Sequence, residues 1–138
     1  MSSALPNDML FELSAYHAVR DPGEVTLGLD LIPGHVIYAG EPSLVPELGP
    51  IPNNGWFYVG HCGGSLREEG SLAWLLSHIR FRIEQLTELL SGGWDIYILL
   101  DQLPDDTIPA VPGALRQECN ELGLSIAISP AYGLIHDA

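Results

Sequence analysis

The chain has 138 residues, which is long enough for one domain with a substantial hydrophobic core. It carries 18 acidic residues against five arginines and no lysine, so its formal net charge is −13. This charge disfavours nucleic acids and anionic membranes as partners, because both are negatively charged. It either favours a basic partner protein or serves only to keep the protein soluble. The lack of lysine also excludes P-loop NTPases, kinases and Schiff-base enzymes.

The N-terminal part predicts a first strand and gives no targeting signal. Residues 1–8 are small, polar or proline and are expected to fray, so a single domain is predicted over residues 9–138. No signal peptide and no apolar run of about 18 residues occurs, which predicts a cytoplasmic protein with reduced cysteines. Residues 9–17 alternate as a strand. Its two faces would comprise Met9, Phe11, Leu13 and Ala15, and Leu10, Glu12, Ser14 and Tyr16.

A short helix is predicted after this strand. Asp21 can cap the helix, Pro22 suits its first position, and Glu24 completes a capping box. The helix is expected to be short because Gly28 and Pro33 end it. Its inner face would comprise Val25, Leu29 and Ile32.

Two predicted strands flank a long loop. Residues 35–39 indicate a brief strand, whereas residues 40–54 contain four prolines, which exclude regular helix and interior strand. A loop of this length in a small domain is either functional or mobile. Residues 55–61 predict a further strand, with Trp56 and Tyr58 on one face.

The stretch from residue 71 to residue 93 predicts one long amphipathic helix. Ser71 suits the N-cap, and Gly92 and Gly93 suit an exit through a left-handed residue. Apolar residues recur at steps of three and four, so one face is expected in the core. That face comprises Leu72, Leu75, Leu76, Ile79, Ile83, Leu86 and Leu90. A second, partly aromatic line either extends the core or binds a partner. It comprises Trp74, Phe81 and Glu88.

The C-terminal part predicts the strongest strand, followed by a further helix and strand. The strand covers residues 94–101, an acidic loop residues 103–112, the helix residues 112–122 and the last strand residues 124–129. The element order matches the split βαββαβ order of a ferredoxin-like sheet with an appended helix and strand. The predicted fold is therefore α+β, with the helices mainly on one face of the sheet.

His61 and Cys62 are the first candidates for chemistry, because they end a predicted strand beside two glycines. A metal site would need further ligands, such as His78, and the chain has no HxxxH, HExxH or CxxC motif. A nucleophilic Cys62 would need a histidine other than His61, since neighbours on a strand point to opposite faces. Paired carboxylates such as Asp105 and Asp106 are expected to be solvated. We therefore predict no catalytic residue, no metal and no cofactor.

Acidic and aromatic residues of the predicted sheet and loops are the candidates for binding a partner. Asp95, Tyr97 and Asp101 share one strand face, which gives an aromatic centre flanked by carboxylates. This arrangement suits the docking of a cationic protein surface, and it equally suits a solvated sheet edge. The candidate partner-binding residues are Glu41, Glu47, Trp56, Asp95, Tyr97, Asp101, Asp105 and Asp106.

Three short motifs occur in a fixed order along residues 9–130. They are Leu31-Ile32-Pro33 with Gly40 after it, Gly55-Trp56 in a strand, and Leu122-Gly123-Leu124 at the last strand. In this order the chain resembles the bacterial domain of unknown function 4279. The resemblance implies no established activity and no catalytic residues. Small acidic bacterial proteins of this sort are similar to immunity proteins, which neutralise a toxin delivered by a competitor.

The predicted function is therefore non-enzymatic. The protein would be an immunity protein that binds a cognate basic toxin or effector, with acidic loops steering the encounter and aromatic residues anchoring it. Two alternatives stay open. One is a small-molecule-binding or regulatory domain with its ligand between the sheet and the long loop, and the other is an enzyme that uses His61, Cys62 or a carboxylate pair.

Overall fold

A computed structural model describes residues 9–43, 47, 49–63, 65–100 and 113–128. The described residues form a five-stranded sheet and four helices. The strands are β1 (Leu10–His17), β2 (His35–Ile37), β3 (Asn54–His61), β4 (Asp95–Leu100) and β5 (Ser125–Ile128). The helices are α1 (Gly23–Leu29), α2 (Leu72–Phe81), α3 (Ile83–Ser91) and α4 (Gly113–Leu122). The predictions for residues 1–8 and for the loop at 103–112 lie outside the described residues.

The first strand lies at the centre of the sheet. The strand order is β2-β3-β1-β4-β5, and β1 is antiparallel to both β3 and β4. β2 pairs antiparallel with β3 at one edge, whereas β5 pairs parallel with β4 at the other. The α+β class is thereby confirmed. The five-stranded order differs from that of a ferredoxin-like sheet, so that more specific prediction is not confirmed.

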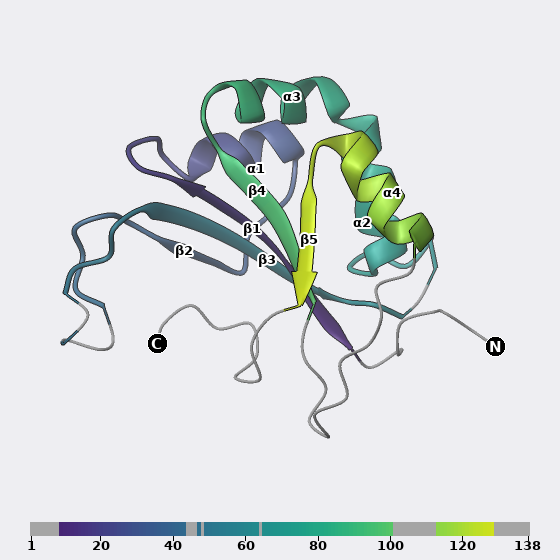
Figure 1. The fold of residues 1–138 in the computed structure, drawn as a ribbon, viewed down its shortest axis with the longest axis horizontal. Helices are drawn as coiled ribbons and strands as arrows, with labels where there is room; N and C mark the ends of the chain where they lie inside the picture. Colours follow the sequence, from purple (N-terminus) through teal and green to yellow (C-terminus); the bar gives the residue numbers. More distant parts are fainter. Residues whose placement is uncertain (1–8, 44–46, 48, 64, 101–112, 129–138) are drawn as a thin grey trace.

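The hydrophobic core lies between one face of the sheet and the helices (Figure 1). Strand alternation directs Phe11, Leu13 and Ala15 of β1 toward the helices, and all three are fully buried. Their register partners on β3 lie on the same face, because opposite residues of an antiparallel pair share a face. The helices complete the core with residues that include Val25, Leu29, Leu75, Ile79, Leu86 and Cys119.

The predicted long helix is two helices, which corrects the prediction of one helix over residues 71–93. Ser71 caps α2 as predicted, since its hydroxyl accepts from the Trp74 N–H at 3.0 Å. Arg82 then leaves the helical conformation, with φ −107° and ψ 29°. Its guanidinium donates to the carbonyls of Gly28 and Leu27, at 3.2 and 3.3 Å. These contacts with the end of α1 hold the bend between α2 and α3.

The bend also changes which side chains of α3 enter the core. Leu86 and Leu89 are buried, whereas Ile83, which the single-helix stripe places inside, is 37% exposed. Val25 and Leu29 of α1 are buried as predicted, but Ile32 is 84% exposed. Leu31 takes its place, because the chain turns at Asp30, which has a left-handed φ of 53°.

Candidate partner-binding face

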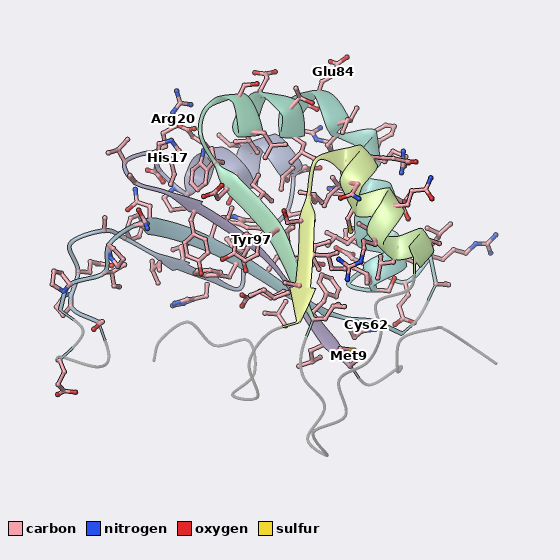
Figure 2. All side chains as sticks on the ribbon, viewed as in Figure 1. Met9, His17, Arg20, Cys62, Glu84 and Tyr97 are labelled. Atoms are coloured by element: carbon pink, nitrogen blue, oxygen red, sulfur yellow. The ribbon has the colours of Figure 1, made fainter. Side chains whose placement is uncertain are left out.

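The face of the sheet opposite the helices carries polar and aromatic side chains, which are buried at Glu12, Ser14 and Phe57 and exposed at Asp95. We call it the open face. Alternation directs Glu12, Ser14 and Tyr16 of β1 to this face. Ser14 is paired with Phe57 of β3 on one side and with Tyr97 of β4 on the other, so these three side chains share the face. Tyr97 of β4 is labelled in Figure 2.

Four aromatic side chains form a continuous row across four strands of the open face. His35 of β2 stacks on Phe57 of β3, with ring centroids 5.9 Å apart. Phe57 meets Tyr16 of β1 edge to face at 5.4 Å, and Tyr16 stacks on Tyr97 of β4 at 5.8 Å. Such cross-strand contacts stabilise a sheet and fix the register of its strands. We call these four residues the aromatic row.

A buried carboxylate lies beside the aromatic row. Glu12 is only 2% exposed, and the Ser14 hydroxyl donates to its Oε1 at 2.7 Å. Burial raises the pKa of Tyr16, and the neighbouring Tyr97 and the charge of Glu12 raise it further. Burial likewise raises the pKa of Tyr97, although its hydrogen bond with Tyr16 acts in the opposite direction. Both phenols therefore stay neutral at physiological pH.

Two of the predicted partner-binding residues, Asp95 and Tyr97, lie together on the open face. Asp95 is exposed and Tyr97 is half-buried, so both are accessible to a partner. Asp95 is the register partner of Tyr16, which places its carboxylate at the aromatic row. The third predicted residue of this strand face, Asp101, lies outside the described residues, as do Asp105 and Asp106.

Trp56 cannot serve as a surface anchor, which corrects its inclusion among the partner-binding residues. It lies on the helix-facing side of β3 and is fully buried. Its indole N–H donates to Thr26 Oγ1 at 3.0 Å. The tryptophan therefore stabilises the contact between α1 and the sheet.

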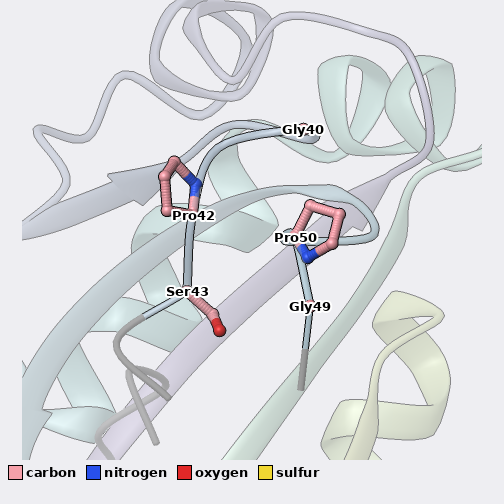
Figure 3. A pocket seen from close by; sticks show the side chains of 5 residues that line it. All are labelled: Gly40, Pro42, Ser43, Gly49 and Pro50. Atoms are coloured by element: carbon pink, nitrogen blue, oxygen red, sulfur yellow. The ribbon is translucent and has the colours of Figure 1, made fainter. Parts of the chain in front are cut away.

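Glu41 and Glu47 lie in the segment between β2 and β3, and both are exposed. Near the base of this segment, Gly40 N–H donates to Ile51 O and Ile51 N–H donates to Glu41 O, each at 2.8 Å. A pocket of about 360 Å³ opens there (Figure 3). Its lining comprises Gly40, Pro42, Ser43, Gly49 and Pro50. These small and proline side chains present a mostly apolar surface and no charged group.

His61 and Cys62 lie at the end of β3, but their surroundings do not favour nucleophilic chemistry. His61 Nε2 lies 3.0 Å from Glu68 Oε2, at the surface. Burial raises the pKa of the Cys62 thiol to about 12, so the thiolate is scarce at neutral pH. His78 is the further candidate ligand for a metal site. Its Nε2 is hydrogen-bonded to Leu29 O at 2.7 Å. Among the described residues, no group of three or more His, Cys, Asp or Glu side chains is placed to hold a metal ion.

The two aromatic residues of the second helix line have different environments. Trp74 is half-buried and stacks on His78, with ring centroids 4.9 Å apart. Phe81, the last residue of α2, is 87% exposed. The line therefore does not extend the core along its whole length, because the helix bends immediately after Phe81.

Few of the arginines are available to neutralise the open face. Arg20 pairs with Glu24 at 3.2 Å, and Arg80 contacts Glu118 and Glu121 of α4 at 3.3 and 3.5 Å. Arg82 bonds to the carbonyls of α1. All three side chains belong to the helical layer or its connections, so the charge of Asp95 on the open face faces solvent.

Glu12, Ser14 and Tyr16 were not among the residues predicted to bind a partner. The alternation of residues 9–17 predicted that these three side chains share one strand face. Alternation does not predict which strands lie on either side of β1. The aromatic row exists because the side chains of β2, β3 and β4 join those of β1, and that pairing is a property of the whole sheet.

Comparison of the chain with protein-family models, with curated proteins and with solved structures gives no significant match. The resemblance to the domain of unknown function 4279 thus rests on the order of its sequence motifs. Among the described residues, no helix has both the length and the apolar composition needed to cross a bilayer.

Proposed function

We propose that this protein is a cytoplasmic, non-enzymatic binding protein of the immunity type, and that the open face binds a basic toxin or effector. The observation that carries the proposal is the position of Asp95 beside the stacked Tyr16–Tyr97 pair, on a sheet face that the helices do not cover. Aromatic side chains and complementary charge are the features that anchor and steer a protein partner.

The overall charge supports the same proposal. A formal net charge of −13 raises the association rate with a cationic protein, because long-range attraction steers the encounter. The exposed carboxylates of Glu41 and Glu47 would extend the acidic surface along the segment between β2 and β3. Salt should weaken such binding strongly, since exposed charges are screened over about 8 Å at physiological ionic strength.

A small-molecule-binding domain is the second candidate function, and the pocket beside Pro42 and Pro50 favours it. The pocket volume of about 360 Å³ suits a small, mostly apolar ligand. Of the described residues that line it, Ser43 is the polar one and none is charged. We prefer a cationic protein partner as the ligand, because it accounts for the strong negative charge of the chain. A small apolar ligand in this pocket does not account for that charge.

Charge reversal on the two sides of the molecule tests the proposed function. The immobilised protein would be incubated with an extract of the source bacterium at low and at high salt. The control for Asp95→Lys on the open face is Glu88→Lys on α3, because both positions are exposed and the charge change is the same. We expect a basic protein to be retained at low salt by the unmodified protein and by Glu88→Lys, and to be lost with Asp95→Lys.

Two results would contradict this proposal. If no basic protein is retained at low salt, the acidic surface has no cognate partner in that cell. If both charge reversals weaken retention equally, the interaction is general ion exchange and the open face is not the binding site.

We further propose a ferredoxin-like relationship for the first four strands. Its support is that β1 lies between β3 and β4 and is antiparallel to both, while β2 is antiparallel to β3. In this interpretation α4 and β5 are the appended helix and strand, and α2 with α3 replaces a single crossover helix. We include in this proposal a relationship to the domain of unknown function 4279. Its support is the order of the sequence motifs.

A further inference from the structure

The aromatic row ends at Tyr97, and the side chains beyond it on the same face are small. On the β1 side, the Tyr97 ring is stacked against Tyr16. On the β5 side, Tyr97 is paired with Ser125, and the next residue of β5 on the same face is Ala127. Ser125 and Ala127 are both small and exposed. We call Asp95, Tyr97, Ser125 and Ala127 the Tyr97 step.

A carboxylate stands at one end of this step. Asp95 and Tyr97 are alternate residues of β4, so their side chains lie on the same face, with Cα atoms about 7 Å apart. Asp95 is exposed. A flat cation lying on β5 beside the Tyr97 ring would therefore meet an aromatic ring on one side and a carboxylate at its end. The neighbouring serine and alanine leave room above the strand for such a group.

We infer that the Tyr97 step binds the guanidinium of an arginine on the basic partner, an inference that rests on the proposed function. A guanidinium is planar, so it stacks on a tyrosine ring while it donates hydrogen bonds to a carboxylate in the same plane. The ammonium of lysine is compact and more strongly hydrated, and it gains less from a ring face. Arginine is thereby preferred over lysine at this position.

The net charge of the molecule favours a guanidinium over a nucleobase as the group that stacks on Tyr97. Aromatic residues on an open sheet face also stack nucleobases in other proteins. Here a net charge of −13 opposes the approach of phosphates, and Asp95 would lie next to the bound nucleotide. The same two features attract a guanidinium.

Peptide binding to the full chain tests the inference. The probe is a short, capped peptide in which arginine and threonine alternate, and the comparison peptide has lysine at the arginine positions. Affinity is measured by anisotropy of a labelled peptide, and the site is located by NMR shifts of the Asp95, Tyr97 and Ser125 amides. We expect the arginine peptide to bind more tightly and to shift these amides.

Variants identify the contribution of each group. Tyr97→Leu should weaken the arginine peptide about two- to fivefold and remove its advantage over the lysine peptide, because the ring face is lost. Tyr97→Phe keeps the ring face and should retain the preference. Asp95→Asn should weaken both peptides and reduce the salt dependence. Glu88→Gln on α3, an exposed acid of the helical layer, should leave both affinities unchanged.

Several outcomes would overturn the inference. They are equal affinity for the two peptides, shifts confined to residues away from the Tyr97 step, or an unaltered preference in Tyr97→Leu. If Tyr97→Leu does not fold, Asp95→Asn and the comparison of peptides on the unmodified chain still decide. If a basic protein is retained through Asp95 but shows no arginine preference, the inference fails and the proposed function stands. If the arginine peptide binds at the step but no basic protein is retained, the step binds a guanidinium, while the proposed function, and with it the partner's arginine, is overturned.

Discussion

Gly60 lies where β3 passes closest to the segment that precedes α2. The N–H of the next residue, His61, donates to Gly70 O at 3.0 Å, which brings the two backbones together. A Cβ built on Gly60 would lie 2.3 Å from Gly70 O and 2.6 Å from the Phe11 ring. Neither neighbour can move freely, because one is backbone and the other is a fully buried side chain.

We therefore expect Gly60→Ala to lower the free energy of unfolding by about 2–3 kcal/mol, as overpacking of a well-packed core does. Gly113→Ala is the matched control, because a Cβ there meets nothing within 4 Å. Urea denaturation measures both. An equally stable Gly60→Ala would show that the close approach is not maintained in solution.

The sequence predicted the face of each strand residue, but it did not predict which of these residues are buried. Strand alternation correctly put Phe11 and Leu13 on the same face of β1, because the period of a strand fixes the face of each side chain. It could not show which face the helices would cover. Trp56 was thus placed both on a strand face and among the partner-binding residues, and only the packing of α1 on that face decides that it is buried.

At the scale of elements, the bend between α2 and α3 depends on Arg82. Its guanidinium bonds to two carbonyls at the end of α1, where a positive charge also interacts favourably with the helix dipole. We expect Arg82→Ala to lower the free energy of unfolding by about 1–2 kcal/mol, because charged hydrogen bonds are lost. Thermal or urea unfolding followed by circular dichroism measures the change.

Arg67→Ala controls for the loss of one positive charge, since Arg67 lies on an exposed turn before α2. Its effect on stability should stay within about 0.5 kcal/mol. Equal destabilisation by the two variants would mean that net charge, and not the contact with α1, explains the effect of Arg82→Ala.

The positions of the elements were largely predictable, whereas the bend was not. Caps, glycines and periodicity located each strand and helix to within a few residues, because these signals are local. The sequence from Leu72 to Leu90 keeps helical spacing across Arg82, so no local signal marks the break. The partners of Arg82 are carbonyls more than 50 residues earlier in the chain, and only tertiary packing brings them near.

For the whole molecule, thiols and phenols whose pKa is raised by burial make stability depend on pH in the alkaline range. Burial raises the pKa of Cys62 from 9.0 to about 12 and that of Cys119 to about 11. The unfolded chain therefore releases protons that the folded chain retains. This contribution to stability is complete below pH 9.0 and is lost as the pH rises through 11 to 12.

We expect the free energy of unfolding to fall with rising pH above about pH 9. Urea denaturation at a series of pH values measures this dependence. Cys62→Ala should make the fall less steep, and Ser65→Ala, a change on the neighbouring exposed turn, should not. Parallel curves for Cys62→Ala and the unmodified chain would show that Cys62 ionises equally easily in both states.

The candidate site is a property of the whole sheet, which limits how much of it the sequence could predict. Composition gave the acidic character, and the strand pattern put Asp95 and Tyr97 on one face. The stacking of Tyr97 on Tyr16 requires β4 to lie beside β1, and these strands are separated by most of the chain. Spacing within one strand carries no information about that neighbour.

The central position of β1 also has a consequence for biosynthesis. Among the described elements β1 is synthesised first, yet its two partners are β3 and β4, which are made much later. Closing such long stretches of chain costs entropy before any strand contact forms, and this slows folding. During translation, the nascent chain must therefore keep both edges of β1 unpaired until β3 emerges, and one edge until β4 follows. A chaperone that shields extended apolar segments would act on β1 during that interval.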